Sequence, residues 1–319
     1  MSELLNVSSN PHVRDKISTS RIMIDVLISL LPASAFGIYN FGIRAFVVIL
    51  VTMVSCVLAE FLFNMVLKKD QTIYDCSALV TGLLLALNLP VSIPLWIAVI
   101  GSFFAIVVVK MVFGGLGQNF MNPALGARCF MLLSFTGQMT KFTLDGVTTA
   151  TPLYMVKHGE KFSVMKMIIG THAGTIGETS VIALLLGAIY LIIRRLIDVK
   201  IPLFYIGTFG VLTCIYAISH GNDMTFVLQE LCGGGLLLGA FFMATDYVTS
   251  PITKNGRIVF GICLGLLTFA FRLLATENAA PEGVSYAIII SNLFVPIIER
   301  FTLPKGFGKE AKTRWKKLS

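Results

Sequence analysis

The sequence predicts an all-α polytopic membrane protein with about ten transmembrane helices in two inverted five-helix repeats. Three observations support this prediction: composition, the spacing of apolar runs and the placement of Lys and Arg. Of 319 residues, 55% are hydrophobic and 13% charged, and the mean hydropathy is +0.83. Soluble domains carry about 25% charged residues. The composition therefore excludes an ordinary soluble domain, a disordered chain and a nucleic-acid-binding protein.

Ten apolar runs follow one another along the chain. A helix needs about 20 residues to cross a bilayer, at 1.5 Å per residue. Most runs are long enough, but 77–89 and 123–135 are short, so we expect short or broken helices there. The ten runs are 22–39, 45–67, 77–89, 94–113, 123–135, 178–193, 201–219, 226–244, 257–275 and 284–298.

Basic residues set the expected orientation. With the N-terminus inside, 17 Lys and Arg residues fall on the cytoplasmic side and five outside. This asymmetry predicts that both termini lie inside. The net charge of +8 is then explained by membrane topology and by contact of the basic residues with anionic lipid. Residues 1–21 lack an apolar signal-peptide core. The predicted segments are a cytoplasmic N-terminal segment 1–21, a first repeat 22–136, an extracytoplasmic loop 137–177, a second repeat 178–300 and a basic cytoplasmic tail 301–319.

Similar sequence words occur in the two halves. Gly82–Ala86 reads GLLLA and Gly235–Gly239 reads GLLLG, and each word is followed by a span with a late cation, Lys110 or Arg272. Five spans per half would give the repeats opposite topology, as in many transporters. A chance match of apolar words is the alternative interpretation.

A glycine-rich stretch precedes the fifth run. Residues 114–124 read GGLGQNFMNPA, where glycines allow sharp bends and close approach. Asn122 is suited to cap the next helix and Pro123 to occupy its first position. Because that helix is short, its N-terminus is expected below the membrane surface, where free N–H groups suit a polar or anionic ligand. A tight turn between two spans is the simpler alternative.

The connection 137–177 is the only long one. Loops of this length are usually functional or disordered. It contains the stretch 145–153, DGVTTATPL, whose Asp, Gly, Thr and Pro residues indicate by themselves only an exposed turn.

Several ionisable residues fall at membrane depth. Glu60 and Glu230 are the deepest acids, and Arg128 and Arg272 are the deepest cations. Buried charge is costly and usually marks a pairing or an ion pathway. The acids are candidates either for ion coordination or for pairing with Arg128 or Arg272. A second group near span ends is expected to snorkel or to cap helices: Asp25, Asp75, Lys110, Glu178 and Asp246.

No metal or hydrolytic site is predicted. The six cysteines form no CxxC or zinc or iron–sulfur spacing and fit packing roles. The four histidines are scattered, and no P-loop, dinucleotide-binding fingerprint or hydrolase elbow is present. Electron transfer or passive solute transport fits this sequence better than hydrolysis.

Three stretches together resemble one family. Residues 114–128 (GGLGQNFMNPALGAR), 145–153 (DGVTTATPL) and 243–251 (MATDYVTSP) are similar to the RnfD/NqrB family of flavin-bearing membrane subunits, and the likeness runs from about residue 20 to 300. The resemblance implies two inverted five-helix halves akin to urea-transporter-like folds. The short N-terminus resembles the RnfD branch.

The resemblance implies a covalent cofactor in the long loop. In that family FMN is joined through its phosphate to a Thr hydroxyl within a signature similar to Asp-Gly-x-Ser-Gly-Ala-Thr. Thr148 stands where the family has Ser, and Thr149 stands where Gly is usual. Thr151 is the expected FMN anchor. The positions that match the signature are Asp145, Gly146, Ala150 and Thr151.

The resemblance also implies partners and a second flavin. A flavin transferase would install the FMN, and other subunits of an Rnf-type ferredoxin:NAD oxidoreductase complex, including a second FMN-bearing subunit, would handle NAD and ferredoxin. A noncovalent riboflavin is expected near Asn119 and Asn122 or near Asp246, and Glu60 and Glu230 are candidates for a Na⁺ or H⁺ pathway. The expected location is a bacterial or archaeal cytoplasmic membrane, with the flavin loop on its outer face.

Two alternatives remain open at this stage. The chain is also compatible with an NqrB-like component of the Na⁺-translocating NADH:quinone oxidoreductase. A urea-transporter-like solute channel would explain the repeats and the broken spans, but it would leave the Thr151 loop without a role.

Overall fold

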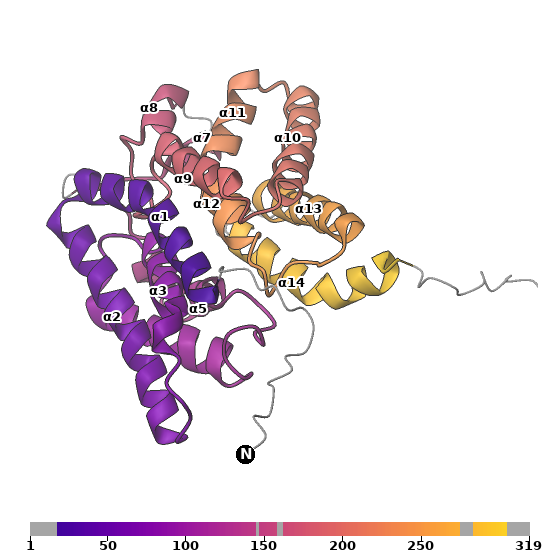
Figure 1. Cartoon of the computed structure of the whole chain (residues 1–319). Coiled ribbons are helices and arrows are strands. Elements are labelled where there is room, and N and C mark those ends of the chain that lie inside the picture. The colour runs from indigo at the N-terminus through magenta and orange to yellow at the C-terminus, as the bar shows by residue number, and fades with distance from the viewer. Residues whose placement is uncertain (1–17, 145–146, 158–161, 275–282, 305–319) are drawn as a thin grey trace, which may run out of the picture.

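The computed structural model describes residues 18–144, 147–157, 162–274 and 283–304. Within them the regular secondary structure is helical (Figure 1), apart from one pair of strands of two residues each. Each of the ten apolar runs is largely helical. The first half contains α1 Thr19–Phe41, α2 Ile43–Val66, η1 Ile73–Asp75, α3 Ser77–Leu87, α4 Leu95–Phe103 with its π-helical continuation η2 Phe104–Met111, and α5 Pro123–Ser134.

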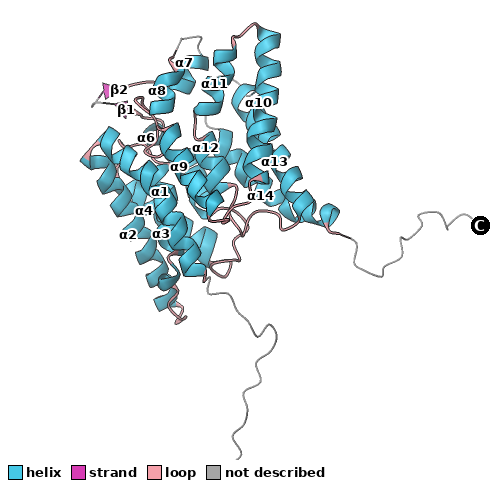
Figure 2. Ribbon diagram, turned by 45° about the horizontal axis from the view of Figure 1, so that its top comes forward, coloured by secondary structure: helices cyan, strands magenta, loops and turns pink. Residues whose placement is uncertain are grey.

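The connection after α5 carries short elements. They are α6 Thr136–Met139, β1 Thr143–Leu144, β2 Val147–Thr148, α7 Pro152–Lys157 and α8 Val164–Ile169. The second half contains α9 Val181–Ile193, α10 Lys200–His220, α11 Met224–Cys232, α12 Leu236–Leu238 with η3 Gly239–Met243, α13 Lys254–Phe269 with η4 Ala270–Leu274, and α14 Gly283–Thr302. Figure 2 shows β1, β2, α7 and α8 gathered at one end of the helices.

Helix length and hydropathy identify a multi-pass membrane protein. In the described residues, five helices are long and apolar enough to cross a bilayer, namely α1, α2, α10, α13 with η4, and α14. Four shorter apolar helices accompany them: Ser77–Leu87, Leu95–Met111, Pro123–Ser134 and Val181–Ile193. The run 226–244 is not one helix, because it bends by 56° between Cys232 and Leu236. Gly234 and Gly235 there have positive φ, which favours glycine.

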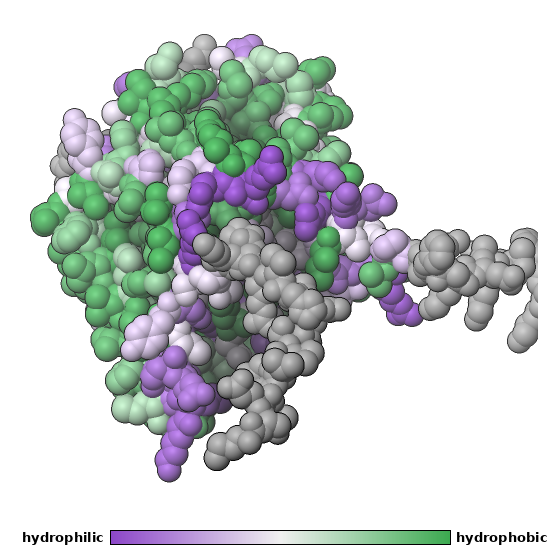
Figure 3. All heavy atoms as spheres, in the orientation of Figure 1, coloured by the Kyte–Doolittle hydropathy of each residue, from purple (hydrophilic) through white to green (hydrophobic). Residues whose placement is uncertain are grey.

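The surface of the helices is largely apolar. Large hydrophobic side chains remain exposed on helices of both halves, including Leu133 at 76%, Ile193 at 74% and Ile218 at 77%. Apolar residues cover most of the helical face seen in Figure 3. Exposed apolar area of this extent marks an interaction surface, and lipid chains are its natural neighbour here.

The two halves meet where α1 packs against α9 (Figure 1). Gly187 of α9 allows a close approach, because a Cβ atom there would overlap the Ser29 carbonyl oxygen and lie 3.0 Å from the Phe242 ring. Small residues at such crossings are the usual way for membrane helices to pack.

Adding a methyl group at this crossing should destabilise the protein. We expect Gly187→Ala to lower the free energy of unfolding by about 1–3 kcal/mol, since the helices must separate to admit the methyl group. Thermal unfolding in detergent measures the change. Gly207→Ala is the matched control, because nothing lies within 4 Å of a Cβ at Gly207 of α10. Equal melting temperatures for the two variants would contradict the close-packed crossing.

The halves repeat an order of elements. A left-handed residue, Cys76 or Gly235, precedes α3 or α12. The next α-helix, α4 or α13, begins the same number of residues later, after Pro94 or Thr253. It ends in π-helical turns, η2 or η4, that carry a buried cation.

The structure corrects the matching of the two sequence words. Gly82 lies inside α3, whereas Gly235 lies at the turn before α12. By element order, Cys76 is therefore the counterpart of Gly235. The likeness of the GLLLA and GLLLG words reflects apolar composition.

Candidate functional site

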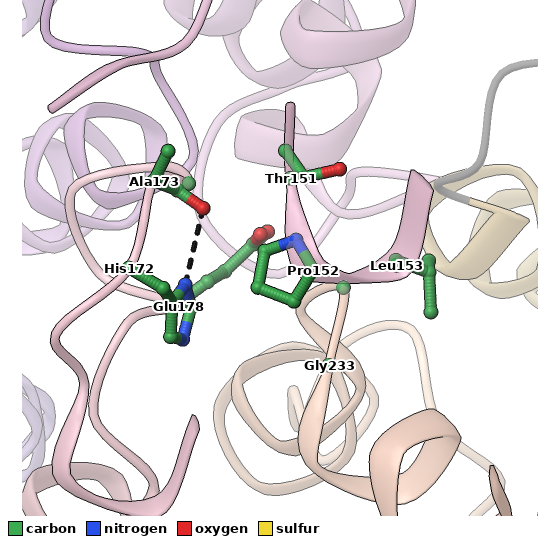
Figure 4. Close-up of a pocket in the computed structure, with 9 residues that line it drawn as sticks. Thr151, Pro152, Leu153, His172, Ala173, Glu178 and Gly233 are labelled. Atoms are coloured by element: carbon green, nitrogen blue, oxygen red, sulfur yellow. Dashed lines mark hydrogen bonds between the residues drawn. The ribbon is translucent and has the colours of Figure 1, made fainter. Parts of the chain in front are cut away.

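Thr151 borders a pocket of about 370 Å³. This Thr151 pocket is built from three separate segments: the start of α7, the connection between α8 and α9, and the glycine turn between α11 and α12 (Figure 4). Its lining residues are Thr151, Pro152, Leu153, His172, Ala173, Gly174, Glu178, Gly233 and Gly234.

Thr151 is placed by the first turn of α7. Its backbone carbonyl accepts from the Met155 N–H at 3.1 Å, and its side-chain oxygen accepts from the Tyr154 N–H at 3.4 Å. The residue is half-buried, while Pro152 and Leu153 after it are buried. Of the expected attachment motif, Thr148 lies in β2 and Ala150 is exposed. Asp145 and Gly146 lie outside the described residues.

The glycine turn forms a wall of the Thr151 pocket. A Cβ atom at Gly234 would lie 2.5 Å from Nη2 of Arg272 and 2.9 Å from the Leu153 side chain. Arg272 donates from Nη2 to the carbonyls of Gly233 at 3.0 Å and Gly234 at 2.8 Å. The same guanidinium contacts Glu230 at 3.3 Å. Thus Arg272, whose charge is paired with that of Glu230, holds the break between α11 and α12 behind the pocket.

His172 occupies the side of the Thr151 pocket opposite α7. Its Nδ1 lies 3.1 Å from the Ala173 carbonyl oxygen, the contact drawn in Figure 4. Burial lowers the pKa of His172 below its usual value, although its hydrogen bond to that carbonyl opposes the shift. The imidazole is therefore neutral at pH 7.

A buried chain of polar groups leads inward from this pocket. Arg128 of α5 donates to Glu178 at 3.0 Å and also to the Asn88 side-chain oxygen. Asn88 lies 3.7 Å from the Met243 sulfur. Asn122 donates to the Met243 carbonyl at 3.3 Å. These contacts join the two halves through the centre of the molecule.

Asn122 and Asp246 border one cavity, which lies at the far end of this series of polar contacts from the Thr151 pocket. This Asn122 cavity has about 510 Å³ of empty space and apolar walls from α1, α9 and η3, with Thr245 beside Asp246. Leu191 near the end of α9 lines it, whereas Glu178 in the Thr151 pocket precedes α9. The two sites are therefore separated by about the length of α9, or roughly 20 Å.

Other residues predicted near this site have local roles. The cap role of Asn122 is confirmed, since its side chain accepts from the N–H groups of Ala124 and Leu125. Asn119 donates to the Met121 carbonyl at 3.0 Å and does not line the Asn122 cavity.

Glu60 lies in a separate polar cluster. It is fully buried and forms an ion pair with Lys110 at 2.7 Å, and it also accepts from Thr72. Lys110 donates further to the Ser77 hydroxyl at 2.6 Å, at the start of α3. Like Arg272 in the second half, Lys110 therefore ties a π-helical span end to the start of a short helix.

Three expectations about charged residues are corrected by these contacts. Glu60 pairs with Lys110 and not with Arg128 or Arg272. Lys110 and Glu178 do not snorkel, because their exposed fractions are 2% and 7%. Asp25 is also buried, and it pairs with Arg194 at 2.9 Å. Asp75 and Asp246 do cap their own turns.

Sequence reasoning missed the residues that complete the Thr151 pocket, His172 and the turn Gly233–Gly235. The three consecutive glycines inside an apolar run were the signal that could have found the turn, since adjacent glycines interrupt a helix. Nothing local to His172 indicates its position opposite Thr151.

Comparison with known proteins assigns a family. The family model described as "NQR2, RnfD, RnfE family" matches residues 6–308. The chain is 46% identical to the D subunit of the Na(+)-translocating ferredoxin:NAD(+) oxidoreductase complex of Acetobacterium woodii, covering 98% of this chain and all of that protein. It is 42% identical to the D subunit of the proton-translocating ferredoxin:NAD(+) oxidoreductase complex of Clostridium ljungdahlii, over 96% of each chain.

A more distant relative comes from an archaeon. The D subunit of the ion-translocating oxidoreductase complex of Methanosarcina acetivorans is 35% identical, over 95% of this chain and 96% of the relative. Near-complete coverage at these identities, with the family match, leads to one conclusion: this chain belongs to the NQR2, RnfD, RnfE family.

Proposed function

We propose that the chain is a membrane subunit of an ion-translocating ferredoxin:NAD oxidoreductase complex and carries FMN joined through its phosphate to Thr151. The single observation that carries the cofactor assignment is the position of Thr151 at the edge of a pocket in a chain of this family. The names of the relatives, which are D subunits of such complexes, support the complex.

The residues around Thr151 fit such a cofactor. The Thr151 hydroxyl accepts one hydrogen bond and is half-buried, so its oxygen lies at the rim. Gly233 and Gly234 present backbone without Cβ atoms, and their carbonyl groups are held in place by Arg272, which is paired with Glu230. Bound FMN would supply one-electron transfer. Thr151 would hold the phosphate, and buried Pro152 and Leu153 would exclude water.

A noncovalent riboflavin is proposed for the Asn122 cavity. Asn122, Thr245 and Asp246 offer hydrogen-bonding groups on otherwise apolar walls, the usual character of a cofactor site. Asn119 is a poor candidate because it does not line this cavity.

The ion pathway is proposed to involve Glu60 and Glu230. Each carboxylate is buried beside a cation, Lys110 or Arg272, so passage of Na⁺ or H⁺ by either acid requires that its ion pair open. The two relatives named for Na⁺ and for protons leave both ions as candidates.

The proposed setting is a bacterial or archaeal cytoplasmic membrane. Ten spans in two inverted repeats would place the termini inside and Thr151 on the outer face. A flavin transferase would act on that face, and the other subunits, including a second FMN-bearing one, would supply the NAD and ferredoxin sites. If the chain belonged instead to a Na⁺-translocating NADH:quinone oxidoreductase, the same fold would serve a complex whose electron acceptor is a quinone.

In-gel fluorescence tests the covalent cofactor. The full chain is co-expressed with a flavin transferase, denatured and separated by electrophoresis, with a transferase-free culture as control. We expect a fluorescent band and a mass increase of one FMN only with the transferase. A band without fluorescence, with an active transferase shown on another substrate, would overturn the proposal. Solute conduction by the protein in vesicles would then favour the alternative of a urea-transporter-like solute channel.

A further inference from the structure

An open groove with about 920 Å³ of empty space lies where α9 leads into α10 and η3 leads into α13. This groove, the Arg195 groove, shares no lining residue with the Thr151 pocket. The starts of α10 and α13 meet beside it, because Asp198 just before α10 forms an ion pair with Arg257 of α13 at 2.6 Å. Both helices are long and apolar enough to cross a bilayer. The groove therefore lies at the depth of lipid headgroups.

Arg195 contributes a positive charge to the wall of this groove. Its guanidinium has no hydrogen bond or ion pair in the part of the chain that the structure describes, and Arg stays charged at pH 7. The charges of Asp198 and Arg257, which also line the groove, offset each other. Tyr247 is neutral, and its hydroxyl donates to the Leu196 carbonyl. The described lining therefore carries a net positive charge.

The same groove has an apolar wall. Hydrophobic side chains continue beyond it, since Ile193 at the end of α9 is 74% exposed and Leu203 of α10 is 62% exposed. A soluble anion gains nothing from such a wall, whereas a molecule that joins a negative headgroup to hydrocarbon chains contacts both parts of the groove. Five aliphatic residues line it: Ile192, Leu196, Ile197, Val199 and Ile201.

The polar side chains of the groove suit a phosphate group. The planar guanidinium of Arg195 can donate to two phosphate oxygens at once. Ser250 also lines the groove, and its hydroxyl has no hydrogen bond to another described residue. A choline headgroup would bring its own positive charge beside Arg195 and Arg257, and a glycerol headgroup would not. The charge of the groove therefore favours a lipid with a net negative headgroup.

We propose that the Arg195 groove binds the headgroup phosphate of an anionic phospholipid. Arg195 and Ser250 donate to the phosphate oxygens, and the acyl chains lie against the aliphatic wall beside α9 and α10. In the proposed orientation this end of α10 faces the cytoplasm, where the membrane surface is negative and attracts Lys and Arg. The site does not depend on the flavin assigned to Thr151.

Native mass spectrometry of the full chain in detergent tests the proposal. The wild type and each variant are titrated with phosphatidylglycerol, with phosphatidylcholine and with inorganic phosphate. We expect the wild type to retain phosphatidylglycerol in preference to phosphatidylcholine. Arg195→Gln should bind phosphatidylglycerol about fivefold more weakly, which is the effect of roughly one basic residue at an anionic headgroup. Because Arg195 is exposed, this variant should fold.

Lys68→Gln is the matched control. Lys68 is the second residue after α2, as Arg195 is the second residue after α9. Both are exposed, and both have positive φ, 52° at Lys68 and 56° at Arg195. Lys68 does not line the groove, so its variant should bind phosphatidylglycerol like the wild type.

Three results would overturn the proposal. The first is equal binding of phosphatidylglycerol by the wild type and Arg195→Gln. The second is an equal loss in Lys68→Gln, which would show a general attraction to surface charge. The third is displacement of the lipid by an equal concentration of inorganic phosphate, which would identify a soluble anion as the ligand.

A measurement on the wild type covers the case in which Arg195→Gln does not fold. Phosphatidylglycerol with a photoreactive acyl chain is crosslinked to the protein, and the labelled peptides are mapped. Label within residues 192–203 supports the groove, and label confined to other segments overturns the proposal.

Discussion

Thr151→Val is expected to abolish covalent flavin labelling completely. A phosphoester requires the side-chain oxygen, and Val offers a methyl group of nearly the same size in its place. The fold should survive, because the Thr151 side chain accepts only a long hydrogen bond of 3.4 Å from the Tyr154 N–H, and losing such a bond costs about 1 kcal/mol. In-gel fluorescence of the denatured chain, scaled to protein amount, measures the effect.

Thr149→Val provides the matched control for this experiment. Thr149 is exposed and precedes Thr151 by two residues, and its backbone N–H is bonded to the Phe142 carbonyl at 3.0 Å. We expect it to label like the wild type. Labelling that persists in Thr151→Val and disappears in Thr149→Val would identify Thr149, and not Thr151, as the residue that carries the flavin.

Lys110→Met should give a large loss of stability. The variant leaves the Glu60 carboxylate fully buried without its cation, and removing one partner of a buried ion pair costs about 3–5 kcal/mol. The Thr72 hydroxyl remains as a donor to Glu60 and moderates the loss. Thermal unfolding in detergent measures the change, with the amount of protein that stays monodisperse at each temperature as the readout.

The double variant Lys110→Met with Glu60→Gln isolates the cause. Because it removes both charges, we expect it to recover most of the lost stability, since a buried pair replaced by uncharged groups is often near neutral. If the single variant melts like the wild type, the Lys110–Glu60 bridge is not a structural element, and both residues are then free to serve ion passage.

Local sequence signals determined the helical elements. Apolar runs of sufficient length must form helices in lipid, where every backbone N–H and carbonyl needs a partner, and all ten runs are largely helical. The cap at Asn122 followed from an Asn-Pro pair before an apolar segment, because the side-chain oxygen replaces the missing helical acceptor. The motif at Thr151 also occupies one continuous stretch, so its resemblance to the family signature is visible in the sequence, and its role stays a prediction.

The tertiary structure decided which charges and cavities belong together. Apolar runs of similar composition do not encode which neighbours they contact, so the partner of Glu60 could not be read from the sequence. The Thr151 pocket joins residues about 20 and 80 positions apart, and the Asn122 cavity joins Asn122 with Asp246. Such contacts depend on how closely helices approach, as at Gly187, and that distance is fixed by the packing of the whole bundle.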